Sequence, residues 1–355
     1  MRSVAVANES LPSLPRRTVV LVNDDYAARE GEQAAVGPRA YEADAAVSDT
    51  ARAVARALTN LGVEVEEVRV TSTLDGLLEQ LAARRVSTVF NLVESLANDY
   101  GREWEVPALL GRHGLRFTGN GPRPLRLCRA KDKTRRLLQR AGVRVAPGFA
   151  VRDAAQLDPA RLAQLCFPCF VKPARVDGSI GIDGGSICHD LPTLRARLAQ
   201  LAHLPGPYLV ETFLPGKEIN VALFPEPHAG HVVATEIDFS DVPEGLPRIV
   251  TYDGKWNPQS PEYAAKSVPA RLDPKLAREV EQLARGAFLA LGGSGYGRVD
   301  MRLDADGAPC VIDVNPNNDL HPDAGLATAA RSVGLGYDAL IRGIVAWAEQ
   351  EQRGA

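Results

Sequence analysis

The sequence predicts an α/β protein, because short apolar segments typical of strands alternate with amphipathic segments typical of helices. A first strand is predicted at 18–22, an apolar run that ends at the turn-forming residues Asn23 and Asp24. Further strands are predicted at 63–68, where polarity alternates, and at 86–92. Strands that alternate with helices usually form a parallel sheet joined by crossover helices. We therefore expect a Rossmann-like parallel-sheet domain at the N-terminal end.

The first helix is predicted to begin near residue 48. The segment 48–50 offers side-chain oxygens suited to an N-cap, and apolar residues then recur at helical spacing from Val54 to Leu61. Gly62 provides the C-terminal stop. The polar stretch that precedes this helix, as far as Glu42, is predicted to be a loop.

The remainder of the chain mixes helices and strands in a pattern expected of α+β subdomains. Helices are predicted at 126–142, 191–202, 273–291 and from near residue 337, strands at 169–173, 208–211, 298–303 and 309–314, a largely strand-like stretch at 218–250, and a long loop at 251–270. We expect a leader at 1–16, an N-terminal α/β domain at 17–125, a small subdomain at 126–208 and a C-terminal subdomain at 209–355.

The composition excludes several classes of protein. Hydrophobic residues make up 45% of the chain and charged residues 24%, as in globular proteins. A net charge of -3 argues against a nucleic-acid partner, and no apolar run is long enough for a membrane helix. The N-terminal residues lack the apolar core of a secretory signal, and five cysteines fit reduced thiols, so we expect a cytoplasmic protein. Cys166 and Cys169 are predicted to be strand-edge thiols, with a redox role as the alternative.

Three oxygen-bearing side chains are expected to meet on a C-terminal hairpin. Asp313 and Asn315 are two residues apart on a predicted strand, so their side chains point to one face. Asp300 lies on the preceding strand and can reach the same face. Two carboxylates and an amide oxygen suit Mg²⁺, whereas two acids left unpaired within apolar strands would be costly to bury. We therefore predict a metal site rather than two solvated strand acids.

A glycine-rich segment at 177–185 follows the predicted strand that contains Lys172. Glycines let backbone N–H groups close on phosphate oxygens, and a nearby lysine supplies positive charge. The spacing is neither that of a Walker loop nor that of a dinucleotide fingerprint, and alone it would more often mark an ordinary loop. Together with Lys131 and the acidic hairpin, it predicts a site for a nucleoside triphosphate and a metal.

Glu211 and Glu218 flank the next turn along the chain. An acid at a strand end suits the edge of a purine, and a second acid seven residues later suits ribose hydroxyls. In isolation, two surface acids would be an equally good interpretation. The order of the three features along the chain favours the nucleotide interpretation.

That order resembles the ATP-grasp superfamily and, within it, the D-alanine–D-alanine ligase group. The resemblance extends over residues 86–345. Matching segments, in chain order, are Phe90-Asn91-Leu92, Val106-Pro107, Phe117-Thr118-Gly119, 131–142, Val171-Lys172-Pro173, Ser179-Ile180-Gly181, Glu211, Pro215-Gly216-Lys217-Glu218 and Gly297-Arg298-Val299-Asp300. An ATP-grasp fold is implied, with the two later subdomains forming the nucleotide site.

The resemblance also implies roles for individual residues in binding ATP and metal. Lys131, Lys172 and Ser179 would contact the ATP phosphates, Glu211 and Leu214 the adenine, Glu218 the ribose, and Asp300, Asp313 and Asn315 two Mg²⁺ ions, with Mn²⁺ as an alternative. Arg298 resembles the arginine that stabilises the oxyanion during acyl transfer. Arg298, Ser179 and Lys172 are accordingly the expected catalytic residues.

Departures from the group's pattern concern the substrates. Gly178 stands where a first serine is usual, Lys255-Trp256 replaces Lys-Tyr, Glu94 lies near the place of a usual histidine, and Asp313 replaces a usual glutamate. Ala324 falls about where a serine would hold the acceptor carboxylate, while Asp319 and Asp323 would repel a carboxylate and attract a cation. We expect Glu94, Lys255, Trp256, Asp319 and Asp323 to contact substrate.

The predicted function is ATP-dependent ligation of an amino acid carboxylate to a basic or uncharged amine through an acyl-phosphate, outside standard D-Ala–D-Ala synthesis. One alternative is a D-alanine–D-alanine ligase with a diverged pocket. Another is a non-catalytic nucleotide-binding protein. The expected partners are small amino acids or amines, and the resemblance suggests a homodimer.

Overall fold

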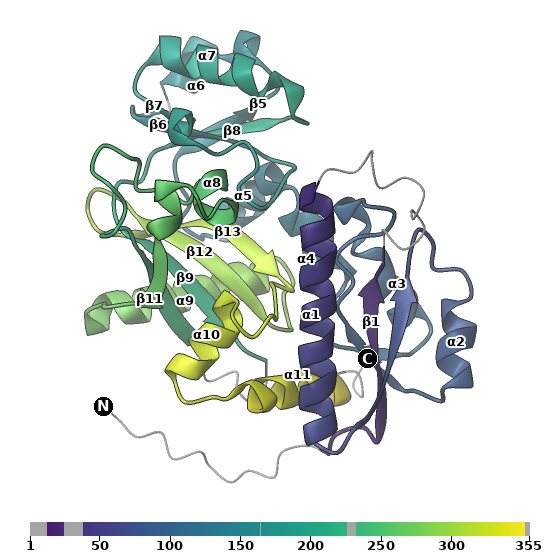
Figure 1. Cartoon of the computed structure of the whole chain (residues 1–355). Helices are drawn as coiled ribbons and strands as arrows, with labels where there is room; N and C mark the ends of the chain where they lie inside the picture. The colour runs from purple at the N-terminus through teal and green to yellow at the C-terminus, as the bar shows by residue number, and fades with distance from the viewer. Residues whose placement is uncertain (1–12, 25–37, 164, 226–231, 352–355) are drawn as a thin grey trace.

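The computed structural model describes residues 13–24, 38–163, 165–225 and 232–351, which form three sheets with helices packed around them (Figure 1). The predicted parallel sheet is confirmed: four strands pair in the order β2-β1-β3-β4, and every pairing is parallel. The strands are β1 (Arg17–Asn23), β2 (Glu64–Val70), β3 (Thr88–Asn91) and β4 (Arg116–Phe117), and the helices between them include α1 (Pro38–Asn60), α2 (Leu77–Ala83) and α3 (Glu105–Arg112).

Helix α1 begins at Pro38 rather than near residue 48, so the prediction of a loop is wrong for residues 38–42. The earlier part of that predicted loop, residues 25–37, lies outside the described residues. The segment 38–49 is rich in alanine, the strongest helix former, and proline is favoured at a helix start. These preferences outweigh the capping signal at 48–50, which lies inside the helix. The predicted apolar face is confirmed, since Val54 is fully buried.

The predicted helix at 126–142 is divided into α4 (Pro122–Cys128) and α5 (Lys131–Arg140). At the break, the backbone N–H of Lys131 donates to the carbonyl of Ala174 at 3.1 Å instead of to the preceding turn. This tertiary hydrogen bond places Lys131 at the start of α5, where its side chain can reach the two later sheets.

The second sheet is antiparallel, in the order β5-β8-β6-β7. Its strands are β5 (Gly148–Val151), β6 (Cys169–Pro173), β7 (Ile187–Cys188) and β8 (Tyr208–Thr212), and its helices are α6 (Pro159–Leu162) and α7 (Leu191–Gln200). β8 crosses the predicted limit between residues 208 and 209, and the domain limits remain a prediction. Cys169 is buried opposite Cys188 and Cys166 is exposed; all five cysteines are free thiols.

The third sheet is also antiparallel, in the order β11-β10-β9-β12-β13. Its strands are β9 (Glu218–Leu223), β10 (Val232–Asp238), β11 (Lys266–Pro269), β12 (Gly297–Leu303) and β13 (Pro309–Pro316), and α9 (Pro274–Ala290) packs against it. The predicted hairpin is thus confirmed as β12 and β13. The predicted loop at 251–270 is in part wrong, because it contains the short helix α8 (Tyr252–Trp256), a 3₁₀ turn (Pro261–Ala264) and β11.

The last helix, α11 (Tyr337–Glu351), returns to the first domain and packs against α1 and the parallel sheet (Figure 1). One apolar core joins α1, α10 (Gly325–Ser332), α11 and β9, with Leu326 and Ile341 fully buried. Glu349, also buried, pairs with Arg116 of β4 at 2.6 Å and accepts a hydrogen bond from Thr88 of β3. None of the helices among the described residues is both long and apolar enough to cross a membrane.

Candidate active site

The β12–β13 hairpin brings the three predicted metal ligands together. Asp300 pairs across the ladder with Asp313, and Asn315 lies two residues further along β13. On its other side Asp300 lies opposite Asn220 of β9, whose amide nitrogen donates to its Oδ1 at 2.9 Å. The amide of Asn315 donates to Oδ2 at 3.0 Å. The sheet register therefore fixes all of these oxygen-bearing side chains on one face.

Arg298 lies on the same face and donates two hydrogen bonds to Asp300, at 2.6 and 2.7 Å. Burial lowers the pKa of Arg298, but the neighbouring carboxylates Asp300, Asp313 and Glu218 outweigh burial and raise it. Burial raises the pKa of Asp313, although Lys131 opposes the shift. The guanidinium therefore stays charged beside the carboxylates of the hairpin.

The donor set of the hairpin suits Mg²⁺, because it offers carboxylate and amide oxygens and no sulfur or imidazole. Within the described part of the chain, no group of three or more His, Cys, Asp or Glu side chains is arranged to hold a metal ion. The candidate site contains two carboxylates and amides, which is the kind of incomplete shell that Mg²⁺ completes with phosphate oxygens and water.

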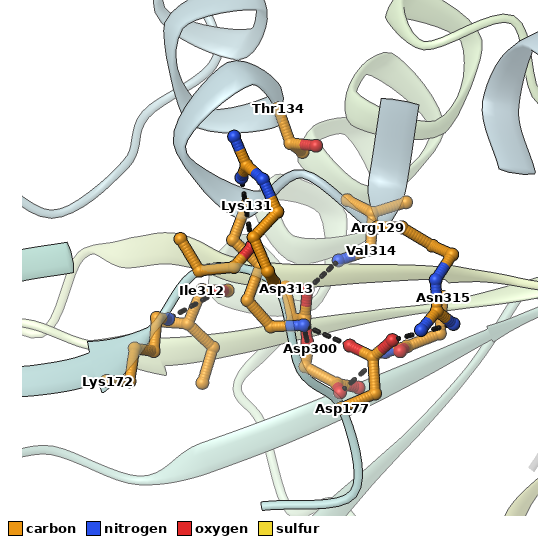
Figure 2. Close-up of polar contacts among 12 residues, drawn as sticks. Arg129, Lys131, Thr134, Lys172, Asp177, Asp300, Ile312, Asp313, Val314 and Asn315 are labelled. Carbon is orange, nitrogen blue, oxygen red and sulfur yellow. Dashed lines mark hydrogen bonds and ion pairs between the residues drawn. The ribbon is translucent and has the colours of Figure 1, made fainter. Parts of the chain in front are cut away.

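Two lysines reach the hairpin from different elements (Figure 2). Lys131, from the start of α5, lies 3.4 Å from Asp313 and also pairs with Asp177 of the glycine-rich loop. Lys172 of β6 donates to the carbonyl of Ile312 at 2.9 Å. Ile312 is the extra residue at the register shift between the two strands, so the bulge turns its carbonyl toward Lys172. Burial lowers the pKa of Lys131, but Asp313 and Asp177 more than compensate and raise it.

The two predicted nucleotide acids also lie beside this hairpin. Glu211, at the end of β8, is buried between Lys172 and Arg135, each 3.2 Å away. It lines one cavity together with Lys131 and Asp313. Leu214 is buried in the turn that follows. One cavity therefore brings together Glu211, a predicted adenine contact, and Lys131, a predicted phosphate contact.

Glu218 begins β9 and pairs with Arg302 of β12 at 3.1 Å. Burial raises the pKa of Glu218, and Arg302 opposes the shift. The same strand carries Asn220, two residues later and on the same face, beside Asp300. Glu218 and the hairpin acids are therefore held by one sheet.

The glycine-rich loop between β6 and β7 is tied to the short helix α8. The indole N–H of Trp256 donates to the carbonyl of Gly178 at 2.9 Å, and the backbone N–H of Tyr252 donates to that of Ile182 at 2.9 Å. Gly178 and Ser179 both adopt left-handed backbone conformations, at φ 66° and 60°. The Lys255 ammonium lies 4.9 Å from the centre of the Trp256 ring. The segment that contains Lys255 and Trp256 thus contacts the predicted phosphate loop directly.

Glu94 lies close enough to Asp319, Lys255 and Arg129 for their charges to act on its pKa. Although Glu94 remains accessible to solvent, enclosure by the surrounding walls and the charge of Asp319 raise its pKa to about 7, against the opposing effect of Lys255 and Arg129. Asp323 is placed differently: its side chain is 87% exposed and lies 4.0 Å from His321. The structure therefore groups Glu94, Asp319 and Lys255, whereas Asp323 is largely exposed to solvent.

Several residues of the site escape prediction from the sequence. Asp177 precedes Gly178 and pairs with both Lys131 and Arg129, the latter at 3.1 Å. The Glu103 carboxylate interacts with Asn317, and burial, together with Glu94, raises its pKa well above the usual range. The signal for Asp177 is a single acid beside the glycines. Glu103 gives no such signal, because a contact with Asn317 depends on the docking of two domains.

Comparisons with known proteins agree with this geometry. Residues 137–346 match the family model described as "D-ala D-ala ligase C-terminus". A D-alanine–D-alanine ligase from Bordetella petrii is 30% identical over 87% of this chain and 89% of its own, and one from Cupriavidus necator is 30% identical over 75% of this chain and 77% of its own. A crystal structure of D-alanine–D-alanine ligase from Bacillus anthracis covers 96% of this chain and 99% of its own with a TM-score of 0.74 at 19% identity; its complex with ATP gives a TM-score of 0.70.

The structural match confirms the predicted ATP-grasp fold. The family model spans more than half of the chain, and relatives that are 30% identical cover most of it. The chain therefore belongs to the D-alanine–D-alanine ligase family, whose members are ATP-dependent ligases that join a carboxylate to an amine.

Proposed function

We propose that this ligase joins an amino acid carboxylate to a basic or uncharged amine other than D-alanine. The observation that carries the proposal is that Glu94 and Asp319 lie near each other and near Lys255, which is itself near Arg298 and Asp300 of the acidic hairpin. Two acids at this place favour an ammonium and disfavour the carboxylate of a second amino acid. A small-molecule substrate pair, a cytoplasmic location and a homodimer belong to the same proposal.

ATP is the proposed phosphate donor. Lys131 and Lys172 would neutralise its phosphates, and Ser179 with its neighbouring amides would close on the γ-phosphate. Glu211 and Leu214 are the proposed adenine contacts, and Glu218 the ribose contact. The support is that Glu211, Lys131 and Asp313 line one cavity.

Asp300, Asp313 and Asn315 are the proposed holders of two Mg²⁺ ions, with Mn²⁺ as an alternative. When bound, the ions would neutralise phosphate charge during transfer. The oxygen-only donor set supports this assignment. Lys131, 3.4 Å from Asp313, would hold the phosphates next to the same face.

The proposed chemistry has two steps. The substrate carboxylate attacks the γ-phosphorus of ATP, which releases ADP and gives an acyl-phosphate. The amine then attacks the acyl carbon, loses a proton and expels inorganic phosphate, while Arg298 stabilises the oxyanion. The lid with Lys255 and Trp256 would exclude water, which would otherwise hydrolyse the acyl-phosphate.

The alternative with specific support is synthesis of D-alanyl–D-alanine, since the curated relatives above carry that name. Product analysis by mass spectrometry, with a panel of carboxylates and amines, separates the two. We expect amide products with basic or neutral amines, and a shift toward carboxylate-bearing acceptors in Asp319→Asn. An unchanged acceptor profile in Asp319→Asn and in Asp323→Asn would contradict the proposed acceptor.

A non-catalytic nucleotide-binding protein is the remaining alternative. It would bind ATP and release no phosphate with any substrate pair. Retention of both lysines, Arg298 and the hairpin acids in one site argues for catalysis.

A further inference from the structure

Arg302 is a buried arginine that no role above explains. It lies on β12 directly opposite Glu218 of β9 and is only 6% exposed. Its Nη1 donates to Glu218 Oε2 at 3.1 Å. Its guanidinium also lies 5.3 Å from the centre of the Phe213 ring, in the turn between the two predicted nucleotide acids. One cation therefore contacts the proposed ribose acid and the turn that precedes it.

The guanidinium also binds two backbone carbonyls, one of them in the turn before Glu218. Nη2 donates to the carbonyl of Gly216 at 3.0 Å, and Nη1 donates to that of Arg248 at 2.9 Å. Gly216 is in turn locked to Leu303 by a backbone hydrogen bond of 2.9 Å, and a Cβ at Gly216 would come within 2.6 Å of the Leu303 side chain. These contacts leave the turn before Glu218 little freedom to move.

Stability alone is a poor explanation for this arrangement. A buried ion pair often contributes no more than apolar residues of similar size would, because both charges lose their hydration. Within the described residues, the buried Nε of Arg302 also has no hydrogen-bond partner. Burial accordingly lowers the pKa of Arg302. Because burying this guanidinium is energetically costly, we look for its role in its effect on Glu218.

We propose that Arg302 is a positioning residue for the nucleotide: it engages Oε2 of Glu218 and so presents Oε1 to the ribose hydroxyls. This inference rests on the proposed ribose role of Glu218. A charged acceptor forms stronger hydrogen bonds with hydroxyl donors than a neutral one, and a fixed carboxylate loses less entropy when it binds. Arg302 therefore sets the preference for ribonucleotides over nucleotides without ribose hydroxyls, and has no effect on the acyl transfer step.

The test compares the dissociation constants of ATP and 2′,3′-dideoxyATP, both with Mg²⁺, by calorimetry on the full chain. We expect the wild type to bind ATP at least tenfold more tightly, as befits a hydrogen bond to a charged group. Arg302→Met should bring the ratio of the two constants close to one while the dideoxyATP constant changes less than threefold. Arg302→Lys keeps the positive charge but not the planar guanidinium, and should retain part of the preference for ATP.

Matched variants distinguish a positioning role of Arg302 from an effect on folding. Glu218→Gln should also reduce the ratio, and the double variant Arg302→Met/Glu218→Gln should be no worse than either single variant, because both act on one contact. Arg302→Lys leaves Glu218 paired with a cation, so it keeps the test decisive if Arg302→Met fails to fold. Arg144→Met removes a surface arginine paired with Glu279 at 2.8 Å and should leave the ratio unchanged.

Four results would overturn the inference. Equal weakening of ATP and dideoxyATP in Arg302→Met would show a structural role only. If Glu218→Gln lowered the ratio but neither Arg302 variant changed it, Glu218 would keep its ribose role and Arg302 would have no positioning role. If the wild type bound ATP and dideoxyATP equally well, Glu218 would have no ribose role, but the proposed ligase function would be unaffected. If the protein bound no ATP at all, the proposed function would be overturned as well.

Discussion

Asp313 carries one of the two carboxylates on which the proposed metal site depends. It lies on the face that also bears Asp300, 3.4 Å from Lys131. Asp313→Asn removes a negative charge and should reduce phosphate release by about 100-fold at fixed Mg²⁺, with part of the loss recovered at high Mg²⁺. Asp313→Glu keeps the carboxylate and should retain most activity. Titration of phosphate release against Mg²⁺ measures both; equal losses in the two variants would contradict the metal role.

Glu94 makes the proposed amine site sensitive to pH. Its pKa is raised to about 7 by enclosure and by Asp319, so the carboxyl is protonated below that pH and ionised above it. An ammonium is bound only by the ionised form, and Lys255 and Arg129 partly offset that charge. We therefore expect kcat/KM for the amine to rise between about pH 6 and pH 8. In Glu94→Gln this rise should disappear; a rise that survives would assign the titration to another group.

At the scale of elements, the glycine-rich loop and α8 are expected to act as one lid. Trp256→Phe keeps the apolar ring but removes the 2.9 Å hydrogen bond to Gly178. Losing about 1 kcal/mol should loosen closure and raise the ATP hydrolysed per amide formed roughly fivefold. Parallel assays of phosphate and amide measure this ratio. Gln259→Ala, an exposed change in the same segment, is the control, and an unaltered ratio in Trp256→Phe would contradict the coupled lid.

Local pattern predicts these elements well where neighbours in sequence set the geometry. The placement of Asp313 and Asn315 on one face follows from the two-residue period of a strand, and the hairpin follows from two apolar runs and a turn. The break between α4 and α5 was not predictable, because it depends on a hydrogen bond from Lys131 to Ala174. The early start of α1 shows helix propensity overriding a plausible cap.

At the scale of the whole molecule, α11 connects the C-terminal half to the first domain by packing against it. Glu349 is buried against Arg116 and Thr88, which lie more than 200 positions earlier in the chain. Glu349→Ala leaves the Thr88 hydroxyl buried without this acceptor and should cost about 2 kcal/mol of unfolding free energy. Urea unfolding measures it. Glu64→Ala, which breaks an exposed pair with Arg17, should cost much less because solvent screens that pair, and equal costs would contradict the account.

Contacts between residues far apart in the sequence explain which features of the site could not be predicted. The proposed phosphate lysines, the hairpin acids and the proposed nucleotide acids could be singled out from the sequence because each lies in a local motif. The contact of Glu103 with Asn317, the pairing of Asp177 with Lys131, and the burial of Arg302 beside Glu218 arise only when separate elements dock. The exposed position of Asp323 has the same origin, since it depends on how the segment after β13 packs.

The most direct test of the central claim is Mg²⁺-dependent phosphate release from ATP, first with D-alanine alone and then with mixed pairs of amino acids and amines. The account predicts release only when a carboxylate substrate and a basic or uncharged amine are both present. Release with D-alanine alone, at a rate equal to that of the best mixed pair, would contradict it.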